Sequence, residues 1–132
     1  MSQPTADPEA LIAAARYLLK TRDTKTVGVW ARAVAYLSRQ ALEAYLDKLW
    51  LDKAPGTERT STRAQLICLP CFLRNEVLAR KATYTWNALS HACHHHSYEL
   101  APTLSELTGW LEVLDELKET VCPCKIMVTV EK

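Results

Sequence analysis

The stretch VGVWARAVAYLSRQALEAYLDKLWLDK, residues 27–53, decides the fold of this chain. Its apolar residues recur at steps of three and four, at Trp30, Val34, Leu37, Ala41, Ala44, Tyr45 and Leu49. The charged residues fall on the opposite side, at Arg32, Arg39, Glu43 and Asp47. Arg39 and Glu43 are spaced for an ion pair across one helical turn. This pattern predicts one long amphipathic α-helix, which the turn-forming residues 54–57 (APGT) end.

The residues before this stretch predict a further helix. Asp7 followed by Pro8 gives an N-cap with proline at the first helical position, so we expect a helix over about residues 8–22. Its inner face is expected to hold Leu11, Ala15 and Leu18. Residues 1–8 lack the basic and apolar regions of a secretion signal, and no apolar run approaches the ~20 residues that cross a bilayer. We therefore expect a cytoplasmic protein that does not enter a membrane.

Two helices are predicted in the middle of the chain. Thr62 with Gln65 resembles a capping box that opens a short helix, and Pro70 should bend or break it. Asn75 can cap a longer helix over about residues 76–95. One stripe of this helix should face the core and hold Ala82, Trp86, Leu89, Cys93 and His96.

The last helix is predicted over residues 103–120. Thr103 with Glu106 forms another capping box, and five leucines follow at helical spacing, at Leu104, Leu107, Leu111, Leu114 and Leu117. Four or five amphipathic helices with short connections predict an all-α protein, an up-and-down bundle. We expect a single domain over residues 7–120 and an extended or disordered C-terminal tail over residues 121–132.

Composition agrees with a single globular domain. The chain has 132 residues, of which 48% are hydrophobic and 23% are charged. Its net charge of +1 conceals an asymmetry, because residues 1–81 carry 13 Lys/Arg against 8 Asp/Glu and residues 82–132 carry 3 against 7. This balance is far from the strongly basic charge of a dedicated duplex-DNA binder.

All four histidines lie within the run SHACHHHS, residues 90–97. The unperturbed pKa of imidazole lies near neutrality, so this run is the first place to look for proton transfer, phosphate contact or metal binding. His91 and His95 have the spacing of a zinc-binding pair, with His94, Cys93 or Glu99 as further ligands. Metal-independent RNA cleavage needs a base, an acid and a cation near the phosphate. Alternatively, the histidines only stabilise the C-terminus of a helix.

The cysteines offer a second candidate site. Cys68 and Cys71 form a CxxC motif, and Cys122 and Cys124 form a CxC motif, which together supply the four thiols of a structural zinc site. The alternative is that the cysteines are reduced thiols, which behave as small hydrophobic residues where they are buried.

The stretch YTWNALSHACHHHSYELAPT, residues 84–103, resembles the signature region of the HEPN superfamily of helical nucleotide- and RNA-binding domains. It is similar to that of small actinobacterial HEPN-like proteins, and a looser resemblance extends over residues 10–120. The resemblance implies a bundle of four to five helices, usually a homodimer, that needs no cofactor. Many members are metal-independent endoribonucleases of toxin–antitoxin or other defence systems, so RNA or nucleotide is the implied ligand.

The resemblance also implies which residues form the site. In the family's motif an arginine is followed, after four to six residues, by a histidine, and the motifs of two protomers meet at the dimer interface. The register here implies His91 and His96 as the catalytic pair. The residues implied to line the same cleft and contact RNA phosphate are Ser90, His94, His95 and Tyr98.

This chain departs from the motif at one position. His91 stands where the family has arginine, which is permanently cationic and binds phosphate in a bidentate manner. Two interpretations follow: an endoribonuclease with a degenerate motif, or a non-catalytic domain that binds RNA or nucleotide. A hypothesis of another class is a non-enzymatic interaction module, such as an antitoxin or adaptor with a cognate protein partner, with or without structural zinc.

Overall fold

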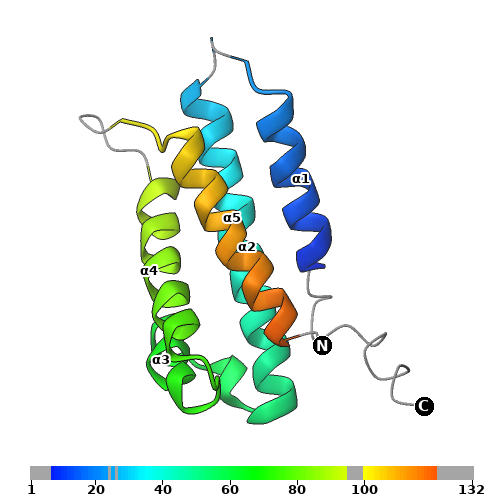
Figure 1. Cartoon of the computed structure of the whole chain (residues 1–132), viewed down its shortest axis with the longest axis vertical. Coiled ribbons are helices and arrows are strands. Elements are labelled where there is room, and N and C mark those ends of the chain that lie inside the picture. The colour runs from blue at the N-terminus through cyan, green and yellow to red at the C-terminus, as the bar shows by residue number, and fades with distance from the viewer. Residues whose placement is uncertain (1–6, 24, 26, 95–99, 122–132) are drawn as a thin grey trace.

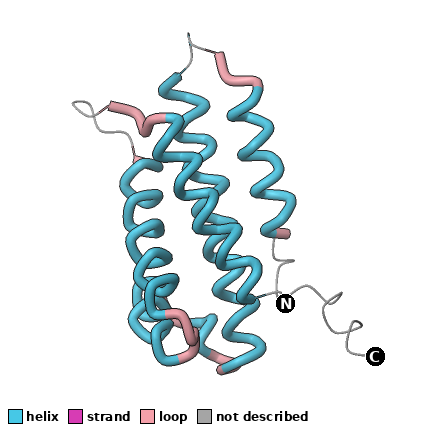
Figure 2. Tube along the Cα trace, in the orientation of Figure 1, coloured by secondary structure: helices cyan, strands magenta, loops and turns pink. Residues whose placement is uncertain are grey.

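The computed structural model describes residues 7–23, 25, 27–94 and 100–121 (Figure 1). Its α-helices are α1 (Pro8–Lys20), α2 (Val27–Lys53), α3 (Thr62–Cys68), α4 (Glu76–Cys93) and α5 (Leu104–Val121). Two short 3-10 turns, η2 (Thr57–Arg59) and η3 (Leu69–Cys71), flank α3. Figure 2 shows helices joined by loops, with no strand in the described ranges. The prediction of an all-α fold is confirmed.

The four long helices run alternately up and down, as an up-and-down bundle requires (Figure 1). Helix α2 packs against α1, α4 and α5 and forms the centre of the bundle. Helix α3 and its flanking turns lie at one end, against α2 and α4. The end of α4 and the start of α5 lie at the other end, and the site described below forms there.

The core lies along α2, whose bounds agree with the sequence prediction. Leu42, Leu46 and Trp50 of this helix are fully buried. Helix α5 contributes four buried leucines, as predicted, at Leu107, Leu111, Leu114 and Leu117. Leu104, the fifth leucine of the predicted stripe, is 38% exposed. Burial of these apolar surfaces is the main contribution that holds the helices together.

The predicted helix starts of three long helices are confirmed by their side-chain caps. Asp7 caps α1, and the Asn75 side chain accepts a 3.0 Å hydrogen bond from the first turn of α4. The backbone N–H of Glu106 donates to the Thr103 hydroxyl at 3.1 Å, and the backbone N–H of Thr103 donates to the Glu106 carboxylate at 3.0 Å. This reciprocal pair is the predicted capping box.

The predicted start of α3 is wrong in its detail. Ser61, rather than Thr62, caps the helix through its hydroxyl. The side chain of Gln65 turns inward instead, accepts a 3.0 Å hydrogen bond from the indole of Trp50 and donates one of 3.0 Å to the carbonyl of Thr60. Because a buried indole N–H needs an acceptor, the Gln65 side chain points inward to Trp50 and does not cap the helix. Pro70 lies just after α3, in η3, so it ends the helix as predicted.

The inner face of α1 is rotated slightly from the prediction. Ala15 is buried as expected, but the other buried leucine and isoleucine side chains are Ile12 and Leu19. Leu11 and Leu18 are partly buried and pack against the edge of the core.

Helix α1 is also connected to α5 by charged side chains. Arg16 pairs with Asp115, and Lys118 pairs with Glu9 at 3.1 Å. These pairs are exposed and screened by solvent, so each contributes little to stability. The described helices include none that is both long and apolar enough to span a bilayer. The C-terminal tail predicted after α5 lies outside the described residues, apart from Val121.

Candidate functional site

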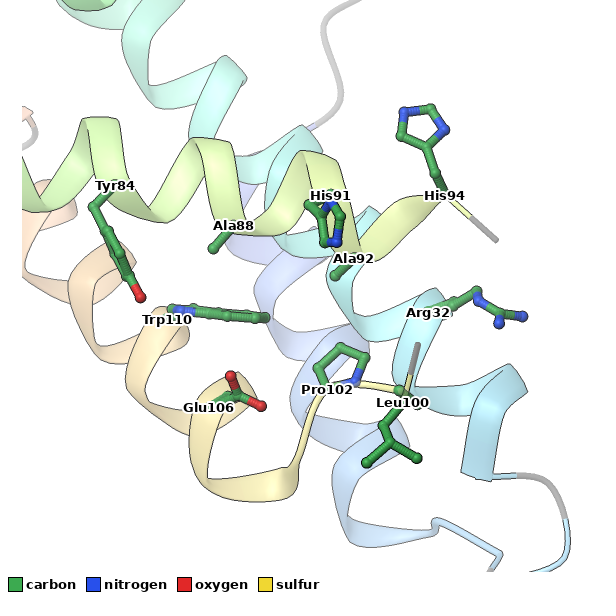
Figure 3. Close-up of a pocket in the computed structure, with 11 residues that line it drawn as sticks. Arg32, Tyr84, Ala88, His91, Ala92, His94, Leu100, Pro102, Glu106 and Trp110 are labelled. Atoms are coloured by element: carbon green, nitrogen blue, oxygen red, sulfur yellow. The ribbon is translucent and has the colours of Figure 1, made fainter. Parts of the chain in front are cut away.

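A cavity of about 190 Å³ lies where the end of α4, the start of α5 and the connection between them meet. Figure 3 shows the side chains around it: Tyr84 and His91 come from α4, Pro102 from the connection and Trp110 from α5. Arg32 reaches the same cavity from α2. The cavity therefore joins residues of the stretch 84–110 to Arg32, which is distant in the sequence.

The end of α4 places two of the four histidines at this cavity. The helix ends at Cys93, two residues before the predicted end at His95, and His94 is its extended C-cap residue. The backbone N–H of His94 donates a 3.2 Å hydrogen bond to the carbonyl of His91. Because α4 ends at Cys93, the helical spacing on which the predicted zinc-binding pair of His91 and His95 relied does not extend to His95.

The two described histidines differ in direction. In Figure 3 the ring of His91 extends from α4 toward the cavity, on the side of Trp110 and Pro102. The ring of His94 and the guanidinium group of Arg32 lie at the rim and point outward. Both histidines are exposed and Arg32 is half-buried, so all three side chains can meet a ligand that enters from solvent.

Of the remaining predicted site residues, the structure describes only Ser90. The Ser90 hydroxyl is buried, does not line the cavity and has no hydrogen-bond partner among the described residues. His95, His96 and Tyr98 lie outside the described residues. Of the predicted catalytic pair, the structure thus places His91 only.

Sequence reasoning missed Arg32, Tyr84 and Trp110 as site residues. Tyr84 precedes His91 by seven residues, two helical turns, and this spacing places both on one face of α4. Trp110 follows the capping box of α5 by one turn, a signal that could have marked it. Arg32 gave no such signal, because nothing in the sequence indicates which residue of α2 lies beside the end of α4.

Backbone and side-chain charges favour an anionic ligand at the mouth of the cavity. The N-terminus of α5 borders it, and the N–H groups of a helix start attract anions. Among the described residues of the lining the one carboxylate is that of Glu106, which accepts hydrogen bonds from the backbone N–H and the hydroxyl of Thr103, at 3.0 and 3.2 Å. Its charge is therefore partly compensated by the cap. Arg32 supplies a permanent positive charge.

A polar contact on another side of α4 fixes this helix against α2. The carboxylate of Glu43 accepts a 3.1 Å hydrogen bond from the indole N–H of Trp86 and pairs with Arg39 at 3.3 Å. The Arg39 guanidinium also lies 5.9 Å from the centre of the Trp86 ring, at cation–π distance. The predicted Arg39–Glu43 pair is thus confirmed, and it is half-buried between two helices rather than on a solvated face.

Two titratable groups near this contact are perturbed. Burial raises the pKa of the Cys93 thiol, against the opposing effect of the Arg39 guanidinium. Burial, followed by the neighbouring carboxylates of Glu43 and Glu58, raises the pKa of Asp47. Both effects arise from the packing of α2 against its neighbours and not from the cavity.

Within the described ranges, no three His, Cys, Asp or Glu side chains come together as a metal site. Cys68 and Cys71 are exposed thiols on and after α3, and Cys93 is half-buried. Cys122 and Cys124, the other half of the predicted zinc site, lie outside the described residues.

Comparison of this chain with models of protein families, with curated proteins and with solved structures finds no match.

Proposed function

We propose that the chain is a nucleotide- or RNA-binding helical domain and that the cavity beside His91 is its ligand site. The observation that carries the proposal is the coincidence of two independent features. Of the eleven described residues that line the cavity, eight lie within the stretch 84–103 that resembles the HEPN signature. The other three are Arg32, Glu106 and Trp110.

The lining matches the chemistry of a nucleotide. A nucleotide has a planar base and an anionic phosphate, and the cavity has aromatic rings at Tyr84 and Trp110 and cationic or protonatable groups at Arg32, His91 and His94. Arg32 is the one permanent cation among the lining residues that the structure describes, and it supplies the charge that His91 lacks in comparison with the arginine of the HEPN motif. The resemblance extends the proposal to a cytoplasmic homodimer in a toxin–antitoxin or defence system.

Together with His96, these residues are suited to metal-independent RNA cleavage. In that reaction a base removes the proton of the ribose 2′-hydroxyl, the 2′ oxygen bonds to phosphorus, and the bond from phosphorus to the 5′ oxygen breaks. An acid protonates the 5′ oxygen as it leaves, so a 2′,3′-cyclic phosphate remains. We assign the base and acid roles to His91 and His96, and the stabilisation of phosphate charge to Arg32.

A binding assay tests the proposal. Fluorescence anisotropy of labelled single-stranded RNA, in the presence of chelator, should show binding by the wild-type protein. Arg32→Ala and His91→Ala should each weaken this binding about tenfold, the loss expected for a charge-assisted contact. Arg59→Ala is the matched control, because Arg59 lies on η2 at the opposite end of the bundle. A wild-type protein that binds neither RNA nor nucleotides would refute the proposal.

Cleavage is tested separately from binding. A denaturing gel of RNA incubated with the protein and chelator should show fragments that end in a 2′,3′-cyclic phosphate, and His96→Ala should abolish them. Binding without fragments assigns the chain to the non-catalytic class of nucleotide-binding domains. Fragments that disappear on chelation contradict the metal-independent mechanism.

A further inference from the structure

A second cavity, of about 400 Å³, lies farther along the groove between α4 and α5. It shares two lining residues with the first cavity, and these are the aromatic residues Tyr84 and Trp110. Arg80 and Lys81 line it on the α4 side. The two cavities are therefore parts of one groove, with an aromatic centre and basic groups toward both ends.

The spacing of the groove residues follows from the helix. Arg80, Tyr84 and His91 are separated by four and seven residues, so they lie along one face of α4. Arg80 and His91 are eleven residues apart, which corresponds to about 16 Å along the helix axis. A single nucleotide beside His91 cannot bring its phosphate to both ends of such a groove, whereas a strand of several nucleotides has phosphates at each end.

The basic groups at the two ends are available for an anion. Arg80 is exposed, and neither it nor Arg32 forms an ion pair within the part of the chain that the structure describes. The ammonium group of Lys81 forms an ion pair with the carboxylate of Glu116 at 3.4 Å. The two arginines, which lie at opposite ends of the groove and form no ion pair with a described residue, are complementary in charge to two phosphates of one strand.

The aromatic centre favours unpaired bases over a duplex. The Tyr84 side chain is 69% exposed, which leaves ring surface on which a base can stack. In a duplex the base faces are covered by their neighbours, so only an unpaired strand can use this surface. The near-neutral charge of the chain also argues against a long electrostatic contact with duplex.

We propose that the α4–α5 groove binds a short unpaired polynucleotide segment, with a base on Tyr84 and Trp110 and flanking phosphates at Arg80 and at Arg32 with His91. The inference rests on the proposed function, and it specifies that the ligand is a strand rather than a free nucleotide. In this arrangement Arg80 does not contact the nucleotide nearest His91. It contacts only a longer ligand, so it determines the preference for a strand over a free nucleotide.

The experiment compares ligands of different length. Dissociation constants are measured for UMP, for oligouridylates of two, four and eight nucleotides, and for a duplex of eight base pairs. Affinity should rise strongly between UMP and the four-nucleotide strand, and the duplex should bind at least about tenfold more weakly than the strand of equal length.

Variants locate the strand on the groove. Tyr84→Ala should weaken strand binding roughly tenfold, and Tyr84→Trp should retain it, because stacking needs a ring. Tyr17→Ala is the matched control, since Tyr17 is 65% exposed on α1 and should have no effect. Arg80→Ala should weaken the binding of the strand but not of UMP, and should lower the slope of log affinity against log salt by about 0.7.

The possible failures are distinguishable. If UMP and the strands bind through His91 and Arg32 but Arg80→Ala and Tyr84→Ala change nothing, the proposed function stands and the strand proposal is overturned. If no nucleic acid binds, both are overturned. If Tyr84→Ala converts a dimer into a monomer in size-exclusion chromatography, the groove is an interface between two copies, and the strand proposal is likewise overturned. Circular dichroism of each variant verifies that it is folded.

Discussion

The indole N–H of Trp86 donates a 3.1 Å hydrogen bond to the carboxylate of Glu43, across 43 residues of sequence. Trp86 lies on α4 and Glu43 on α2, so this contact joins the helix that carries His91 to the helix that carries Arg32. Each of the two helices extends from the contact toward the cavity. The position of Arg32 relative to His91 therefore depends on how α4 packs on α2 at Trp86.

Trp86→Phe should lower the free energy of unfolding by about 1 kcal/mol, because a hydrogen bond to a half-buried carboxylate is lost while the ring is largely kept. Urea unfolding followed by circular dichroism measures the change. The matched control is Trp30→Phe, since the Trp30 indole donates to the Asp23 carbonyl at 3.1 Å in an exposed place and its loss should cost less. Equal effects of the two substitutions would contradict the role of the Trp86 contact.

Gln65→Leu should lower the free energy of unfolding by ~1–3 kcal/mol, because it leaves the buried indole N–H of Trp50 without an acceptor. The Thr60 carbonyl loses its donor at the same time. Gln40→Leu is the control: Gln40 bonds the Tyr36 hydroxyl at an exposed place on α2, and its replacement should change stability little. If Gln65→Leu lowers the free energy of unfolding less than Gln40→Leu does, the buried amide of Gln65 is not needed for stability.

Asp47→Asn should stabilise the protein at neutral pH. Burial raises the pKa of Asp47, so the ionised side chain opposes folding at pH values above the raised pKa. As the pH falls through the raised pKa toward the ordinary value of 3.8, the wild-type carboxyl becomes protonated first in the folded state, and the advantage of asparagine should disappear. Melting temperatures across this pH range provide the test, with the exposed Asp52→Asn as control. A stabilisation by Asp47→Asn that grows toward acid pH would contradict the raised pKa of Asp47.

Cys93 should react with iodoacetamide more slowly than Cys68 and Cys71. Burial raises the pKa of the Cys93 thiol and limits access to it, whereas the other two thiols are exposed. Peptide mass spectrometry after timed alkylation at pH 8 distinguishes the three sites. In denaturant the difference should vanish, because the shift arises from folding. Faster labelling of Cys93 in the folded protein would be inconsistent with its packing beside Arg39.

Most of the fold could be predicted because it depends on local patterns. The apolar spacing of residues 27–53 gave the bounds of α2, and the Thr103–Glu106 box gave the start of α5. The cap of α3 was missed because Ser61 and Thr62 are adjacent and both can cap, and only the burial of Gln65 decides between them. That burial is a tertiary contact with Trp50, which local patterns do not contain.

The candidate site could be predicted only in part. The histidine run indicated the end of α4, and the structure places His91 and His94 at a cavity there. Helical spacing assigned Arg32 to the side of α2 away from the core, which is correct, but that side meets the end of α4. The pairing of α2 with α4 is set by nonlocal packing, so no periodicity within α2 could reveal the contact.

The indole resonances in a two-dimensional ¹H–¹⁵N NMR spectrum test the central claim most directly. The chain has four tryptophans, of which Trp110 lines the cavity and Trp50 is fully buried in the core. On titration with a four-nucleotide RNA in chelator, the Trp110 resonance should shift in a saturable manner and the Trp50 resonance should stay in place, with the shift weakened in Arg32→Ala. A Trp110 resonance that does not move at saturating RNA would contradict the assignment of this cavity as a nucleotide-binding site.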